Sequence, residues 1–207
     1  MSESSTSICS MALSRLGAKR INDLDDATDT KPEAVYCRLF FTQVAKQLMR
    51  SYIWRFAQSR VRLSEDASWS DDDNTDFGYL HVYHLPADFL RLVLVWNGSE
   101  RPQQETGYIY QLEGLRLLTD ETSAYVRYVK WVSDVGAWDS LFIEVMILEL
   151  AKRLVIPLSQ DMDMKAGIDK DLDLMMRKVR TMDRQEQERI GRHDLLPWQD
   201  ARYSDHA

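Results

Sequence analysis

The sequence predicts an α+β protein: a helical bundle formed by both ends of the chain, with an inserted, mostly antiparallel β domain. Apolar residues recur at helical spacing near both ends, whereas in the middle large and polar residues alternate as they do in strands. The strand-like runs are short and are separated by turn residues, which is typical of antiparallel pairing. The 207 residues suffice for one domain with a sizeable insertion.

Two helices are expected near the N-terminus. Apolar residues share one face over residues 5–16, and Gly17 is a natural stop because glycine adopts the left-handed conformation at low cost. A second helix is expected to begin at Thr30 and Glu33, which have the spacing of a capping box, and to end near Tyr52. Its apolar positions again form a helical stripe.

The middle of the chain is expected to form five or six short strands. Asn97-Gly98 and Glu113-Gly114 are turn signals that separate them. The segment at residues 65–78 is expected to be an exposed loop because it is acidic and rich in turn residues. Asp71, Asp73 and Asp76 loosely resemble a calcium loop, but the Gly and the terminal Glu of such a loop are missing, so a solvated loop is favoured. The expected strands cover residues 60–63, 79–85, 89–96, 108–112, 115–119 and 124–132.

Two further helices are expected after the strands. Asp139 is the expected cap of the first, which is apolar almost all round and should be the most buried element, and Pro157 is expected to end it. The last helix is expected to start at Ser159 or Asp161. Its apolar residues recur in steps of four and three, as in a narrow seam against one partner helix. They are Met164, Ile168, Leu172, Met175, Val179 and Met182.

These patterns divide the chain into four parts. Residues 1–57 are the first part of a helical domain, and residues 58–138 are the inserted β-rich domain. Residues 139–191 are the second part of the helical domain, with the long last helix, and residues 192–207 are an extended C-terminal tail.

No sequence motif indicates catalysis, a metal or a cofactor. The chain contains no nucleophile elbow, phosphate-binding glycine motif or zinc-ligand spacing. His81 and His84 should point to opposite faces of a strand, and Cys9 and Cys37 are expected to be small core residues. We therefore expect a protein that is not an enzyme and needs no cofactor.

No apolar run is long enough to cross a membrane and no signal peptide is recognisable, so synthesis and residence in the cytoplasm are expected.

The net charge of −7 disfavours tight binding to nucleic acid. Basic residues nevertheless gather near the end of the second helix. They form either a nucleic-acid patch or a set of charges that offsets the abundant Asp residues, within the subunit or across an interface. The acidic balance favours the second interpretation. The residues are Lys46, Arg50, Arg55, Arg60 and Arg62.

An ordered set of short segments carries a family resemblance. They are ICSMALSRLGAKRINDLDD, WRFAQSRVRL, FGYLHVYHLPADFLRLV, YQLEGLRLLTD and YVRYVKWVSDVGAWDSLFIEVMILELAKRLV. In this order, over residues 8–190, they resemble the head–tail adaptor proteins of short-tailed bacteriophages, called tail tubular protein A.

The resemblance implies a structural virion protein at the head–tail junction, made in the host cytoplasm. About twelve copies would form a ring under the portal protein and join it to the tail nozzle protein. DNA would pass through the axial channel without sequence-specific binding. Helical parts would face the portal, and the β-rich part would face the nozzle.

Two candidate sites follow for this role. The charged end of the last helix has no wide apolar face and suits contacts between subunits. Trp198 is a large apolar anchor in a polar tail, which could become ordered when it binds the portal or a neighbouring adaptor. The candidate subunit-interface residues are Met175, Val179, Met182, Arg184 and Arg189, and the candidate partner-binding residues are Leu195, Leu196, Trp198 and Tyr203.

Asp-rich loops, including Asp71 to Asp73, are expected to contribute an acidic channel lining that repels DNA phosphates.

A small cytoplasmic protein–protein interaction module, or an assembly chaperone, is the alternative function. An enzyme built from scattered Asp, Glu, Arg and His residues is a third and less favoured class.

Overall fold

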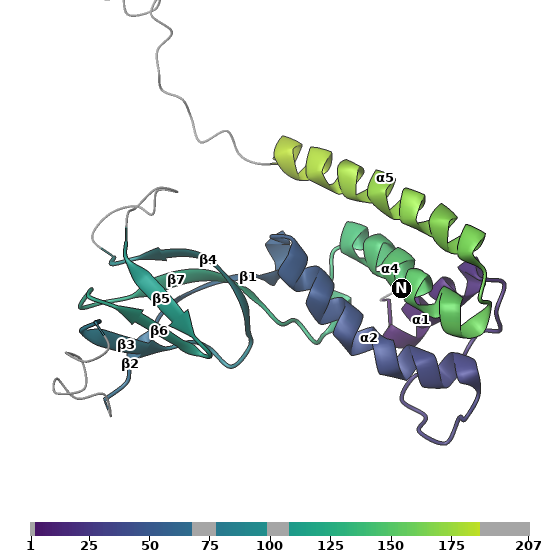
Figure 1. The fold of residues 1–207 in the computed structure, drawn as a ribbon, viewed down its shortest axis with the longest axis horizontal. Helices are drawn as coiled ribbons and strands as arrows, with labels where there is room; N and C mark the ends of the chain where they lie inside the picture. Colours follow the sequence, from purple (N-terminus) through teal and green to yellow (C-terminus); the bar gives the residue numbers. More distant parts are fainter. Residues whose placement is uncertain (1–2, 68–77, 99–107, 187–207) are drawn as a thin grey trace, which may run out of the picture.

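Helices from both ends of the chain pack together, and the strands between them form a second lobe (Figure 1). The computed structural model describes residues 3–67, 78–98 and 108–186. The predicted fold class is confirmed: the helical bundle contains N- and C-terminal helices, and antiparallel sheets are inserted between them. The bundle comprises α1 (Ser5–Arg15), α2 (Pro32–Ser51), α4 (Ser140–Leu158) and α5 (Met162–Glu186).

Helix α4 lies at the centre of the bundle and packs against α1, α2 and α5. Buried residues lie around most of its circumference, among them Phe142, Val145, Ile147 and Leu148. Asp139 caps this helix as predicted, because its carboxylate accepts a hydrogen bond from the backbone of Leu141 at 2.8 Å.

The helix runs through Pro157 to Leu158, so the prediction that this proline ends α4 was wrong. Proline cannot donate a backbone hydrogen bond to the preceding turn. At this position only the final turn is affected. Helix α4 closes when the backbone N–H groups of Ser159 and Gln160 both donate to the carbonyl oxygen of Val155.

The predicted capping box of α2 was also wrong. The N-cap residue is Lys31, no side chain caps the helix, and Pro32 occupies the first turn. Proline has no N–H to be capped and its fixed φ suits the first helical position, so the helix begins there. The carboxylate of Asp29 instead accepts a hydrogen bond from the N–H of Lys31 at 3.1 Å.

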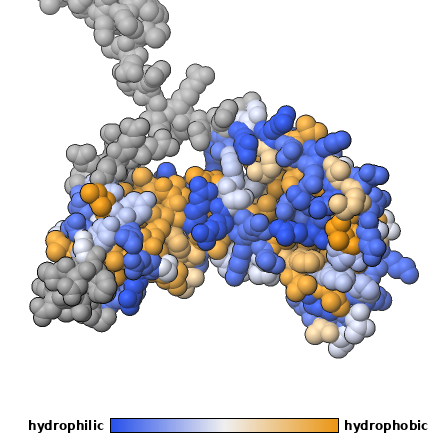
Figure 2. All heavy atoms as spheres, in the orientation of Figure 1, coloured by the Kyte–Doolittle hydropathy of each residue, from blue (hydrophilic) through white to orange (hydrophobic). Residues whose placement is uncertain are grey.

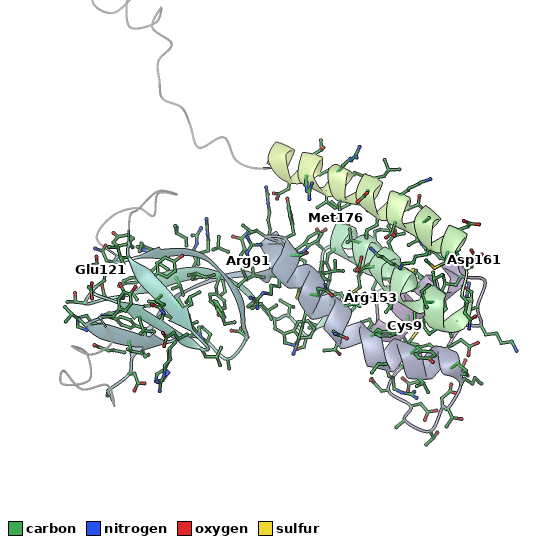
Figure 3. All side chains as sticks on the ribbon, in the orientation of Figure 1. Cys9, Arg91, Glu121, Arg153, Asp161 and Met176 are labelled. Atoms are coloured by element: carbon green, nitrogen blue, oxygen red, sulfur yellow. The ribbon has the colours of Figure 1, made fainter. Side chains whose placement is uncertain are left out.

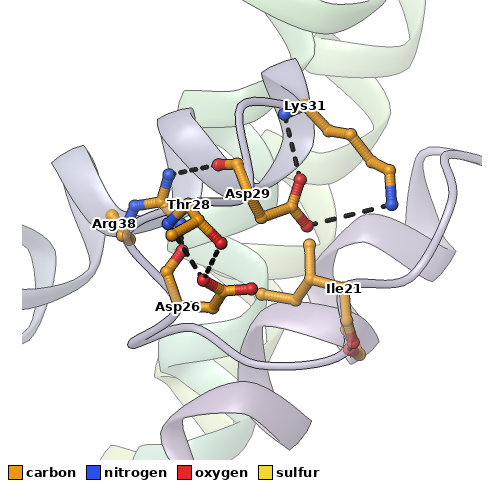
Figure 4. A network of polar contacts seen from close by, with 7 residues as sticks. Ile21, Asp26, Thr28, Asp29, Lys31 and Arg38 are labelled. Atoms are coloured by element: carbon orange, nitrogen blue, oxygen red, sulfur yellow. Dashed lines mark hydrogen bonds and ion pairs between the residues drawn. The ribbon is translucent and has the colours of Figure 1, made fainter.

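The connection between α1 and α2 is held by polar contacts rather than by regular structure (Figure 4). Arg38 donates to the carbonyl oxygens of Asp26 and Asp29, both at 2.6 Å. Thr28 donates to the Asp26 carboxylate through its N–H and its hydroxyl. The pKa of Asp26 is lowered, first by the hydroxyl of Thr28 and then by its backbone N–H.

The β lobe consists of two antiparallel sheets. Sheet A has the order β1-β7-β4, and sheet B has the order β2-β3-β6-β5. Apolar residues of both sheets form one core, which includes Tyr83, Val95, Leu117 and Val126. The strands are β1 (Gln58–Arg62), β2 (Ser64–Glu65), β3 (His81–His84), β4 (Phe89–Trp96), β5 (Tyr110–Glu113), β6 (Arg116–Thr119) and β7 (Tyr125–Lys130).

Asp66 departs from the expected exposed acidic loop. It is buried, and its carboxylate lies 3.2 Å from Nε2 of His84 and 3.4 Å from Nη2 of Arg116. Its backbone N–H also donates to the carbonyl oxygen of Val82 at 2.8 Å. Asp66 therefore extends the β2–β3 pairing. Burying its charge is tolerated because the guanidinium group of Arg116 lies beside it.

Aromatic residues join the two lobes. Short 3-10 turns, η1 (Arg55–Ala57) and η2 (Val135–Ala137), connect the sheets to the bundle. The ring of Phe142 lies at centroid distances of 5.0 to 5.1 Å from the rings of Trp54, Phe56 and Trp138. Edge-on aromatic pairs of this kind each add about 1 kcal/mol beyond the burial of area. The junction is thus a packed core rather than a flexible linker.

Candidate assembly interface

Helix α5 lies along α4, and its apolar stripe faces the chain's own core (Figure 1). Ile168 and Val179 are buried, while Leu172 and Met175 are half-buried against the same cluster. An ion pair of 2.6 Å between Lys152 and Asp169 adds a polar contact between the two helices. The narrow seam predicted from the sequence therefore has α4 as its partner helix.

The C-terminal part of α5 is tied to the junction between the lobes. Arg55 donates from Nε to the Asp183 carboxylate at 2.9 Å, and from Nη2 to the Asp183 carbonyl oxygen at 2.8 Å. The hydroxyl of Tyr52 donates to the same carboxylate at 2.9 Å. Burial, followed by this hydrogen bond, raises the pKa of Tyr52. These contacts hold the C-terminal part of α5 against the junction.

A small cavity of about 80 Å³ lies beside this anchor. Its wall is mixed: Leu141, Val179 and Met182 contribute apolar side chains, and Arg55, Asp139 and Asp183 contribute charged ones. A cavity of this size is far below the several hundred Å³ of small-molecule sites. It fits one side chain better than a substrate.

The structure describes the side-chain environment of three candidate subunit-interface residues, namely Met175, Val179 and Met182. Val179 is only 3% exposed and lies in the intrachain core, so its side chain offers almost no surface to a second subunit. Met175 and Met182 are half-buried. Arg184 lies in the last turn of α5, and Arg189 falls outside the described residues. The interface role of this set stays a prediction, and Val179 fits it least.

The candidate partner-binding residues also fall outside the described residues. These are Leu195, Leu196, Trp198 and Tyr203. The same holds for Asp71 to Asp73, which were expected to contribute to the channel lining. Both assignments stay predictions.

Exposed apolar side chains on the helical lobe mark a further candidate surface. Val35 and Leu39 are four residues apart on α2, and therefore on one face, with Leu39 61% exposed. Met162 and Leu174 on α5 are also exposed. Figure 2 shows hydrophobic residues at the surface of this lobe among hydrophilic ones.

A second group of exposed apolar side chains lies on the β lobe. Ile109 is 71% exposed, and Tyr110, Leu112 and Leu115 are exposed around the β5–β6 hairpin. Strand β5 is at the end of the order of sheet B, and all four of its residues are exposed. Figure 2 shows hydrophobic residues on this lobe as well. Tyr110 and Leu112 are two apart on β5 and therefore share one face, and contiguous exposed apolar groups are typical of surfaces that bind other proteins.

The five basic residues predicted to gather near the end of α2 make different kinds of contact. Only Arg55 of the five has an acidic partner within the part of the chain that the structure describes, namely Asp183. Lys46 lies 5.2 Å from the ring centroid of Trp131, and Arg62 lies 5.8 Å from that of Tyr125. Intrachain charge compensation therefore accounts for one member of the cluster.

The sequence did not single out Arg127 as a candidate site residue, because one basic residue in an alternating strand resembles any solvent-facing position. Register places it opposite Arg60 on the neighbouring strand. Another arginine, Arg91, lies at the boundary between the lobes (Figure 3) and donates to the carbonyl oxygens of Arg50 and Ser51 at the end of α2. That contact suits the negative end of a helix dipole.

The cysteines and histidines that were considered as catalytic or metal-binding residues make contacts within the fold. Cys9 and Cys37 are buried and free, and the hydrogen bond between them, together with burial, raises the pKa of Cys9. His81 contacts Glu65 at 2.6 Å, whereas His84 contacts Asp66. Among the described residues, no three His, Cys, Asp or Glu side chains gather as a metal site requires.

Two comparisons with known proteins complete the description. No model of a known protein family matches this chain. No curated protein matches it either. Within residues 3–67, 78–98 and 108–186, no helix has the length and apolar character needed to span a membrane.

Proposed function

We propose that this protein is a structural virion protein, a ring-forming head-to-tail adaptor that joins the portal to the tail nozzle and lines a channel for DNA. It acts through surface contacts rather than catalysis. About twelve copies form the ring at the head–tail junction, and no cofactor is required.

The observation that carries this proposal is the presence of exposed apolar groups on both lobes. A protein that joins two different partners needs a binding surface for each. Val35 and Leu39 belong to the helical lobe, and Ile109 and Leu115 belong to the β lobe. The two surfaces lie on either side of the packed aromatic junction. The order of the short segments that resemble tail tubular protein A supports the same role.

Imaging tests the proposal. The full chain is mixed with particles of the portal protein from the same virus, and the mixture is examined by electron microscopy. We expect a ring of adaptor density on one face of the portal, with its β lobes pointing away. Absence of binding to the portal would contradict the proposal. Binding to unassembled portal subunits, followed by dissociation before they form a ring, would favour the chaperone alternative.

Two matched variants test the polarity. Leu39→Ser is expected to weaken binding to the portal, while Ile109→Ser is expected to weaken binding to the nozzle and to leave portal binding unchanged. Both positions are strongly exposed, so neither change should affect folding. Equal effects of both variants on both partners would contradict the assignment of one lobe to each partner.

A further inference from the structure

Three arginines share one face of sheet A. In the register of the antiparallel strands, Arg60 lies opposite Arg127 and Arg62 lies opposite Tyr125. Residues directly opposite each other in such a pair project to the same face of the sheet, as do residues two apart on one strand. Arg60, Arg62 and Arg127, termed the arginine face, therefore project together. Their side of the sheet is opposite to that of Val126, which lies in the core of the β lobe.

The Nε atom of Arg127 is buried without compensation. Among the described residues it has no hydrogen-bond partner. Its pKa is lowered, first by burial and second by the charge of Arg60. Two guanidinium groups held side by side repel each other unless an anion lies between them or beside them.

Arg62 is held in place by aromatic rings. Its guanidinium lies over the ring of Tyr125, and that ring is stacked on Trp96 at a centroid distance of 5.7 Å and an angle of 22°. A guanidinium group positioned in this way keeps its donors free for an anionic ligand. Across the described parts of the chain, no carboxylate oxygen lies within 4.0 Å of a side-chain nitrogen of the three arginines.

The charge of the β lobe indicates which anion this face receives. Residues 58–138 contain 13 acidic and 7 basic side chains, so they hold −6 of the net charge of −7. Three of those seven basic residues form the arginine face. A second copy of the same lobe offers many carboxylates, whereas the acidic remainder of the lobe repels a phosphate polymer.

We propose that the arginine face binds carboxylates on the β lobe of a second copy of this chain. Arginine suits this ligand because its planar donors match a carboxylate in two parallel hydrogen bonds. The contact joins two unlike surfaces of identical chains, which is the geometry that closes a ring. As a ring contact it rests on the proposed adaptor function, but the contact between copies is tested separately.

Chemical cross-linking tests the contact directly. The full-chain variant R60K/R62K keeps both charges and introduces amines that a carbodiimide couples to adjacent carboxylates. Equal amounts of isotope-labelled and unlabelled protein are mixed, both free at high concentration and bound to portal particles. We expect mixed-label peptides that join residues 60 or 62 to acidic residues of the β lobe in at least one of the two samples. Links within one chain only, or no links at these positions in either sample, would overturn the proposal.

Charge reversal gives a second test with a matched control. R60E/R62E and K19E/R20E change the net charge equally, and Lys19 and Arg20 are exposed on the helical lobe. We expect R60E/R62E to weaken association between copies at least tenfold, with K19E/R20E close to the natural sequence. Equal association in both variants would count against the arginine face. A failure to bind the portal at all, with the cross-links still present, would remove the adaptor function and leave the contact standing.

Nucleic acid is the competing ligand, and the same variants distinguish it. Binding to a fluorescent DNA duplex is measured at fixed ionic strength for the natural sequence and for R60E/R62E. We expect weak binding that differs little between them. Substantial binding that only R60E/R62E abolishes would assign the arginine face to DNA and overturn the proposal.

Arg127→Met separates a binding role from a structural one. Methionine replaces the unbranched part of the side chain, up to the position of Nε, and removes the guanidinium charge. We expect the melting temperature of the free protein to rise by a few degrees while association between copies weakens. A fall in melting temperature would show that Arg127 serves the fold, and would contradict this part of the inference.

Discussion

Tyr52, Arg55 and Asp183 form a contact between residues far apart in the sequence. The aromatic hydroxyl and the guanidinium group both donate to one carboxylate on α5. The donors come from the segment that leads from α2 to β1, so three elements meet at one acceptor. Removal of either donor should loosen the end of α5 without disturbing the main core.

Tyr52→Phe tests this contact through its pH dependence. The pKa of Tyr52 lies above the ordinary value, so the neutral phenol stabilises the folded state. That contribution is fully present below pH of about 10 and is lost as pH rises through the higher pKa of the folded protein. At neutral pH we expect the variant to lose about 1 kcal/mol of unfolding free energy, because a hydrogen bond to a charged acceptor is removed.

Urea unfolding at several pH values measures both effects. Above pH of about 10, the stability of the natural sequence should fall more steeply than that of Tyr52→Phe. Tyr83 and Tyr128 also have raised pKa values, chiefly through burial, so part of the decline remains in the variant. Tyr36→Phe is the matched control, since this ring stacks on Phe40. Identical pH profiles for the two variants would contradict the assigned role.

At the scale of single residues, the sequence revealed little of these contacts. Asp183 and Arg55 are separated by 128 positions, and no local pattern links them. Arg127 looked like an ordinary polar position of an alternating strand, and only strand register placed it beside Arg60. Such pairings depend on tertiary geometry, which periodicity does not encode.

At the scale of elements, periodicity predicted well because burial imposes it. The run at residues 89–96 coincides with strand β4, and the apolar character of residues 140–155 identified the central helix α4. Errors fell mainly at ends and caps, as with Thr30 and Pro157, and at the start of the acidic segment, where Glu65 belongs to β2 and Asp66 is buried. End positions depend on one or two hydrogen bonds, and competing local solutions differ little in free energy.

The C-terminal end of α4 provides a prediction at this scale. Gln160 adopts a left-handed backbone conformation with φ of 55°. A residue with a Cβ atom pays roughly 1–2 kcal/mol for this conformation, and glycine does not. We expect Gln160→Gly to raise the unfolding free energy by about 1 kcal/mol, because the αL closure of the helix is kept without the steric cost.

Thermal unfolding measures the effect, and Gly17 supplies the reciprocal control. Gly17 has φ of 66°, and a Cβ atom added there would meet no other atom within 4 Å. Gly17→Ala should therefore lower stability through backbone strain alone, by a similar amount. A loss of stability in Gln160→Gly would mean that the glutamine side chain stabilises this turn in another way.

At the scale of the whole molecule, the two lobes and the end of α5 have different relations to assembly. The lobes meet at a packed aromatic junction, where the ring of Phe142 contacts those of Trp54, Phe56 and Trp138. Helix α5 is anchored to this junction by Asp183, close to the point where the described chain ends at Glu186. The candidate partner-binding residues follow that point in the sequence.

Removal of residues 192–207 tests the role of the tail. The contacts of the bundle and of the β lobe described above involve residues up to Asp183, so the shortened chain should unfold with the same midpoint as the full chain. We expect it to fail to join portal particles, because apolar anchors such as Trp198 contribute disproportionately to binding.

A full-length chain with Trp198→Ala and Tyr203→Ala separates the anchors from the length of the tail. If the anchors dominate, this variant should lose binding to the portal nearly as completely as the truncated chain does, with an unchanged unfolding midpoint. If the length dominates, it should bind normally while the truncated chain does not. Normal joining by the truncated chain would exclude the tail from the assembly contact. The adaptor hypothesis would then depend on the exposed apolar groups of the two lobes and on the arginine face.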